Sequence, residues 1–141
     1  SGEALQRLTN IVCAQGGDAS FVKDPDVLPT APVIQTISAP WTGYISQIDA
    51  KAVGLAAMHL GAGRRTKEDL IDPSVGLVLN VKTGDAVVVG QPIGTIHAHT
   101  AGEAQACERE LVSALQCRAD PVTPWRPVVA RISRSEGVVT F

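Results

Sequence analysis

Residues 76–98 read GLVLNVKTGDAVVVGQPIGTIHA, a stretch in which short apolar runs alternate with turn residues. The turns fall at residues 82–85 and 90–92, where glycine permits a left-handed backbone and proline cannot donate to a strand ladder. Valine and isoleucine dominate the runs between them, and both residue types favour strands. The stretch therefore predicts three short consecutive strands.

Periodicity on either side of this stretch predicts both helices and further strands. Apolar residues at helical spacing form stripes, such as Leu5, Leu8 and Val12 in the first helix, whereas alternating runs predict strands. Gly16 and Gly17 end the first helix, because glycine adopts the left-handed conformation common at helix ends. Helices are expected over residues 1–15, 50–60 and 100–119, and further strands over 33–38, 43–49 and 128–133.

This order of elements lacks the regular alternation of strand and helix that builds a doubly wound parallel sheet. We therefore expect an α+β fold, with a short-strand antiparallel or mixed sheet that resembles a barrel-sandwich half-barrel and has flanking helices. The chain of 141 residues suits one domain. We divide it into a helix and linker over residues 1–32, an α+β C-terminal domain over 33–133 and a tail over 134–141.

Composition excludes several classes of function. Lys and Arg number 12 against 14 Asp and Glu, so no basic surface for nucleic acid is expected. No apolar run approaches the ~18 residues that span a membrane, and no secretory leader opens the chain. Three cysteines without a CxxC pair suit reduced thiols in a cytoplasmic protein. Since Ser1 opens the chain and Met58 is its one methionine, we expect a piece of something longer or a processed chain.

The chemical motifs of the sequence are weak. The run from Gly61 to Thr66 begins like a dinucleotide fingerprint but lacks its third glycine and follows a helix, which favours a helix end. Glu68, Asp69 and Asp72 are either an acid–base pair or a solvated loop in which Asp72 forms the turn before a proline. We expect no catalytic residue in this chain.

His97 and His99 are the remaining candidates for chemistry. At a spacing of two they share a strand face, which could place two imidazoles on one metal, but a zinc site needs three or four ligands. The simpler interpretation is a solvated strand end. We therefore expect no metal site.

The turns of residues 76–98, together with Gly43-Tyr44-Ile45, resemble those of the biotinyl and lipoyl carrier domains. Those carriers present one lysine on a hairpin between their two halves. Here residues 50–71 replace that hairpin, and no Met-Lys-Met is present. A carrier-like binding or interaction module without catalysis is therefore the alternative hypothesis.

A longer ordered set of motifs resembles the C-terminal domain of the pyrimidine nucleoside phosphorylases, and within them the thymidine phosphorylases. It comprises Leu60-Gly61-Ala62-Gly63-Arg64, then Lys67-Glu68-Asp69, Ile71-Asp72 and Val75-Gly76, followed by Lys82-Thr83-Gly84-Asp85. The resemblance implies a pentosyltransferase that reversibly cleaves thymidine- or uridine-type nucleosides with phosphate. The products are the free base and a ribose or deoxyribose 1-phosphate. A nucleotide phosphorylase of the same superfamily is a further alternative.

The resemblance also implies how this chain takes part. Its partners would be the upstream α and α/β domains of the same enzyme, which is expected to be a homodimer. Phosphate is the co-substrate, and no cofactor is expected. The family's phosphate- and base-binding motifs lie upstream of the matched region, so this chain alone should be inactive. The loop that could close over the cleft consists of Gly61, Ala62, Gly63, Arg64, Arg65 and Lys67.

Overall fold

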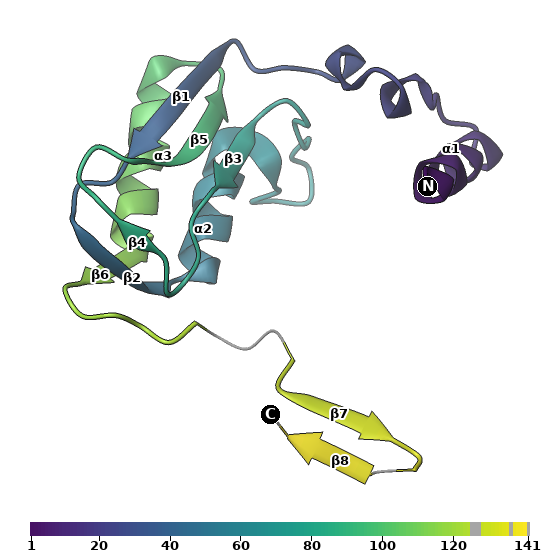
Figure 1. Cartoon of the computed structure of the whole chain (residues 1–141). Helices are drawn as coiled ribbons and strands as arrows, with labels where there is room; N and C mark the ends of the chain where they lie inside the picture. The colour runs from purple at the N-terminus through teal and green to yellow at the C-terminus, as the bar shows by residue number, and fades with distance from the viewer. Residues whose placement is uncertain (125–127, 136, 141) are drawn as a thin grey trace.

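The computed structural model describes residues 1–124, 128–135 and 137–140. Strands β1 to β6 and helices α2 and α3 form the main body, and α1 and the β7–β8 hairpin extend away from it (Figure 1). The elements are α1 Glu3–Ala14, η1 Ser20–Val22, η2 Pro25–Val27, β1 Val33–Ser38, β2 Gly43–Ile48, α2 Ala50–Ala57, η3 Met58–Ala62, β3 Gly76–Leu79, β4 Ala86–Val87, β5 Pro92–Ala98, α3 Ala101–Ala114, β6 Leu115–Arg118, β7 Ala130–Ser133 and β8 Gly137–Thr140.

The main body contains two three-stranded sheets, ordered β1-β5-β3 and β4-β2-β6. Each pairing between the described strands is antiparallel. The three strands expected within residues 76–98 are present, but they separate: β3 and β5 pair with each other, whereas β4 pairs with β2. The α+β prediction is confirmed, and the sheets do not close into a barrel.

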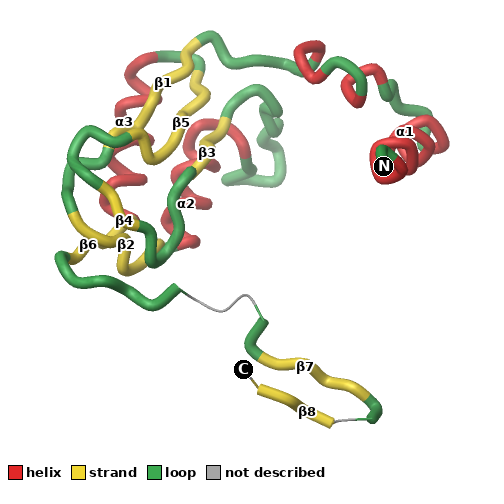
Figure 2. Tube along the Cα trace, viewed as in Figure 1, coloured by secondary structure: helices red, strands yellow, loops and turns green. Residues whose placement is uncertain are grey.

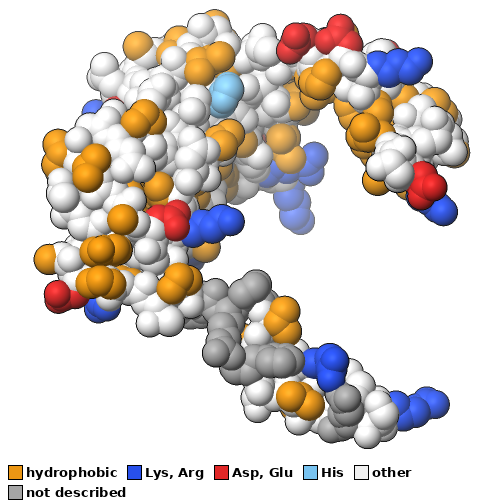
Figure 3. Space-filling model, viewed as in Figure 1, with side chains coloured by type: hydrophobic (Ala, Val, Ile, Leu, Met, Phe, Trp, Pro, Cys, Tyr) orange, Lys and Arg blue, Asp and Glu red, His pale blue; other side chains and the backbone are white. Residues whose placement is uncertain are grey.

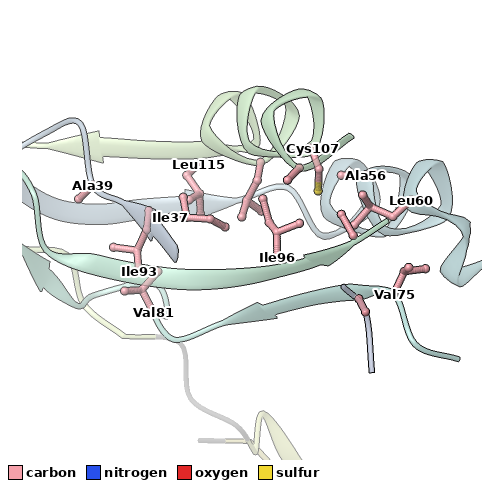
Figure 4. Close-up of a cluster of buried hydrophobic side chains, with 14 of the residues drawn as sticks. Ile37, Ala39, Ala56, Leu60, Val75, Val81, Ile93, Ile96, Cys107 and Leu115 are labelled. Atoms are coloured by element: carbon pink, nitrogen blue, oxygen red, sulfur yellow. The ribbon is translucent and has the colours of Figure 1, made fainter. Parts of the chain in front are cut away.

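Aliphatic side chains from both sheets meet the inner faces of α2 and α3 to form the core (Figure 4). Ile37, Ile45, Ile93, Ile96 and Leu111 are completely buried. In the part of the chain that the structure describes, no polar or charged residue is buried. Aliphatic packing therefore holds the body together. Each fully buried side chain contributes ~1.5–3 kcal/mol of stabilising free energy.

Helix α3 is shorter than the expected 100–119, and this prediction was wrong at its C-terminal end. The helix begins with a capping box in which Thr100 Oγ1 accepts from the Glu103 amide and Glu103 Oε2 accepts from the Thr100 amide. It ends at Ala114, and the next four residues form β6, which pairs with β2. Pairing places Leu115 in the core, and that long-range gain overrides the helical preference of the local sequence.

The segments outside the main body are mostly irregular, apart from α1, η1, η2 and the terminal hairpin (Figure 2). Helix α1 ends as expected: the Gly17 amide donates to the Val12 carbonyl, the Gly16 amide donates to the Cys13 carbonyl, and Gly16 has a φ of 80°. These two backbone hydrogen bonds form a Schellman motif. No helix among the described residues is both long and apolar enough to cross a membrane.

Candidate functional site

The candidate loop begins where α2 ends. The chain passes from α2 into one π-helical turn, η3, and leaves it at Gly61, whose φ is 110°. The Gly61 carbonyl then accepts from the Asp72 amide at 3.0 Å, which closes the loop at its base. The interpretation of Gly61–Gly63 as a helix end is confirmed, and the strand needed before a dinucleotide fingerprint is absent at this position.

Asp69 organises the interior of this loop. Its Oδ2 accepts from the Arg65 amide at 2.9 Å and the Thr66 amide at 3.0 Å, and its Oδ1 accepts from Thr66 Oγ1 at 2.7 Å. These bonds, above all those from Thr66, lower the pKa of the Asp69 carboxyl, because they favour its ionised form. Asp69 is therefore a structural anion rather than a proton donor. The Thr-x-x-Asp spacing of residues 66–69 is the sequence signal for this arrangement.

The three basic residues of the loop have different roles. Arg65 is held in place, since its Nη2 donates to the His59 carbonyl at 3.1 Å. Arg64 and Lys67 are exposed, and neither has a hydrogen bond or ion pair with another described residue. Basic side chains project into solvent beside β3, where this loop lies (Figure 3). Arg65 is thus anchored, whereas Arg64 and Lys67 are available to bind an anion.

A second polar cluster fixes the chain between the loop and β3. Asp72 Oδ1 accepts from the Ser74 amide at 2.8 Å and from Ser74 Oγ at 2.6 Å. Asp72 Oδ2 lies 2.6 Å from His99 Nε2. The Ser74 bonds first, and His99 after them, lower the pKa of Asp72 to about 2. The expected turn before Pro73 is confirmed, and His99 is a partner that spacing alone did not indicate.

This cluster predicts an acid-sensitive contribution to stability. Because the folded pKa of Asp72 lies below its ordinary 3.8, its contribution is present above pH 3.8 and is lost as the pH falls towards 2. The urea midpoint of Asp72→Asn should therefore lie below that of the unmodified chain at pH 6, and the gap should narrow between pH 4 and pH 2. Ser74→Ala should shrink the pH-dependent part of that gap. A gap that stays constant down to pH 2 would contradict the assignment.

A surface pocket of about 320 Å³ lies between η3 and α3. His59 Nδ1 lies 2.9 Å from Glu110 Oε2 across it, and Arg65 and Cys107 also line it. Burial raises the pKa of the Cys107 thiol to about 11, so this thiol stays protonated and packs as a small apolar group. The contact between His59 and Glu110 connects η3 to α3, and Arg65 donates to the His59 carbonyl. The residues that line the pocket therefore form no nucleophile–base pair.

The remaining candidate residues stay apart. Asp69 and Asp72 serve different hydrogen-bond clusters, so they do not form an acid–base pair. His97 lies within β5, whereas His99 contacts Asp72. Across the described ranges, no three His, Cys, Asp or Glu side chains come together in a way that could hold a metal ion.

Comparison with known proteins places this loop in a family context. Residues 44–117 match the family described as "Pyrimidine nucleoside phosphorylase C-terminal domain". The chain is 47% identical over 132 residues to the pyrimidine-nucleoside phosphorylase of Geobacillus stearothermophilus, a match that covers 94% of this chain and 30% of that protein. It is 46% identical over 99 residues to the pyrimidine-nucleoside phosphorylase of Bacillus subtilis (strain 168), covering 70% of this chain and 23% of that protein.

A third relative is the pyrimidine-nucleoside phosphorylase of Staphylococcus haemolyticus (strain JCSC1435), which is 40% identical over 124 residues. That match covers 88% of this chain and 28% of the relative. The chain thus spans less than a third of the length of these three relatives. The family match includes most of the main body and the whole candidate loop, and on this evidence the chain belongs to the family of pyrimidine nucleoside phosphorylase C-terminal domains.

Proposed function

We propose that this chain is the C-terminal portion of a pyrimidine nucleoside phosphorylase that cleaves thymidine- or uridine-type nucleosides with phosphate. The observation that carries the proposal is the family match over residues 44–117, which takes in the candidate loop. Phosphate attacks the anomeric carbon, the C–O bond forms as the glycosidic C–N bond breaks, and the base leaves with developing negative charge. The enzyme needs no cofactor and takes phosphate as its co-substrate. It acts in the cytoplasm as a homodimer and uses the upstream α and α/β domains for phosphate and base binding.

Within that enzyme the proposed units of this chain are a helix and linker over 1–32, the α+β domain over 33–133 and a tail over 134–141. The loop from Gly61 to Lys67 is the element that closes over the cleft. Arg64 and Lys67 are exposed and unpaired among the described residues, so they can approach the phosphate or the leaving base. Closure also excludes water, which would otherwise compete with phosphate for the sugar.

The activity is tested by comparing the full-length protein that contains this sequence with the 141-residue chain. The full-length protein should release thymine from thymidine, or uracil from uridine or deoxyuridine, only when phosphate is present. The isolated chain should release neither, since the groups that hold phosphate and base are upstream. Phosphate-dependent release by the isolated chain would overturn the assignment of the active site, and inactivity of the full-length protein on all three nucleosides would overturn the function.

The role of the loop predicts a separate kinetic result. In the full-length enzyme, the double variant Arg64→Ala and Lys67→Ala should lower kcat/KM by about tenfold to a hundredfold, because two cations no longer meet the developing charge. The thermal midpoint should not change, since these side chains hold nothing together in the described part of the chain. Lys51→Ala, an exposed lysine on α2, is the matched control and should leave both quantities unchanged. Equal effects of the double variant and the control would remove the loop from the mechanism.

A further inference from the structure

Helix α1 carries an apolar stripe that nothing in the described chain covers. Leu5, Leu8 and Ile11 expose 57%, 40% and 55% of their surface, and no residue of α1 is buried against the rest of the described structure. Hydrophobic side chains lie along this arm in the space-filling view (Figure 3). A helix of 12 residues is marginal by itself in water, so its stability depends on packing of this stripe.

Polar side chains outside the stripe form hydrogen bonds within α1. Gln6 Nε2 donates to Asn10 Oδ1 at 3.0 Å, one turn apart, and Thr9 Oγ1 donates to the Leu5 carbonyl at 3.0 Å. The C-terminal end is closed by the Schellman motif, in which Gly17 folds back on Val12. The C-terminal end of the helix and these polar side chains are therefore bonded within the arm, whereas the apolar stripe has no packing partner among the described residues.

The comparison with the Geobacillus stearothermophilus enzyme indicates what the partner is. That match takes in 132 of the 141 residues, so at least the C-terminal part of α1 lies inside it. The matched region is only 30% of the relative, which leaves most of its polypeptide available to contact this helix. The C-terminal part of α1 thus aligns with a protein whose chain is much longer than the matched region.

We infer that the stripe of Leu5, Leu8 and Ile11 is an intramolecular docking surface, covered by the part of the same polypeptide that precedes Ser1 in the full-length enzyme. This inference rests on the proposal that the chain is the C-terminal portion of a longer enzyme. It assigns α1 to the interface between this domain and the upstream domains.

A thiol-labelling experiment on the full-length enzyme tests the surface without using activity. Ile11→Cys places a thiol on the stripe, and the native Cys13, two residues along and ~160° around the helix, is an exposed reference on the other side. In native full-length enzyme, maleimide should label the introduced thiol at least tenfold more slowly than Cys13, with peptide mapping to separate the sites. In urea the two rates should agree. Similar rates in the native enzyme would overturn the docking surface.

The photo-cross-linking amino acid p-benzoylphenylalanine, introduced in place of Ile11, identifies the occupant. Irradiation should give a cross-link that runs as a single chain on a denaturing gel and maps to a residue upstream of Ser1. A product of twice the mass would show that a second copy covers the stripe and would overturn the inference. Protection together with an intrachain cross-link, but without phosphorolysis, would leave the docking surface standing and reject only the proposed function.

A stability comparison uses the same helix with matched charges. In the full-length enzyme, Leu8→Asp should lower the thermal midpoint by several degrees, because it buries a charge in the interface. Asn10→Asp, on the polar face, should leave the midpoint within about one degree. Equal midpoints for the two variants would contradict burial of the stripe.

Discussion

Replacement of Leu111 by alanine is expected to lower the free energy of unfolding of the chain by ~2–5 kcal/mol. Leu111 is on the inner face of α3 and is completely buried in the core. Truncation removes the burial of most of a side chain and leaves a cavity that the surrounding isoleucines can fill only in part. Since domains of this size are stable by only ~5–15 kcal/mol, the loss is a large share of the total.

The measurement is urea unfolding of both proteins, followed by circular dichroism. Leu70→Ala is the matched control, because Leu70 lies just beyond the candidate loop and exposes 90% of its surface. That variant should change the free energy of unfolding by no more than ~0.5 kcal/mol. If the two leucines gave similar losses, the assignment of the core to the interface of α3 and the sheets would be wrong.

Gly94→Ala is expected to destabilise the chain by ~1–3 kcal/mol. Gly94 lies in β5, the central strand of its sheet, where a Cβ would approach the Val78 carbonyl oxygen to 2.6 Å and Ile37 Cδ1 to 3.3 Å. The first contact is with backbone, so β3 would have to move and its ladder with β5 would weaken. The loss should be visible as a lower urea midpoint and as faster amide exchange in β3 than in β2.

The same substitution has the opposite expected sign in α2. A Cβ at Gly54 meets no atom within 4 Å, and the residue is exposed in a helix interior. Gly54→Ala should therefore stabilise the chain by ~0.5–1 kcal/mol, because alanine loses less backbone entropy than glycine on folding. If Gly94→Ala also stabilised the chain, the close approach of β3 to β5 at Gly94 would be in doubt.

Local chemistry was sufficient for the turns and most element ends. The glycines and proline between residues 82 and 92 separated three strands correctly, and Gly16 and Gly61 ended their helices in left-handed conformations. Asp72 was correctly placed in the turn before Pro73. In each case the residue acts on its own backbone or on neighbours a few positions away, so the information lies within a short stretch of sequence.

The candidate site depended on contacts that no local pattern contains. His99 binds Asp72 from 27 residues away, and His59 contacts Glu110 from 51 residues away. Arg64 and Arg65 are adjacent in the sequence, yet of the two only Arg65 is anchored, by its hydrogen bond to the His59 carbonyl. Composition does not distinguish the two arginines, whereas the folded structure does.

Local sequence and tertiary contacts determine different features of this fold. The apolar and turn residues of this chain determine an α+β domain of short strands, since alternation and glycine placement act locally. Tertiary contacts decide that residues 115–118 pair with β2 instead of continuing α3, and that β4 pairs with β2 instead of with β3 or β5. Both pairings bury side chains, such as Leu115 and Val87, in the core. That gain exists only once the chain has folded, because it comes from residues far apart in sequence.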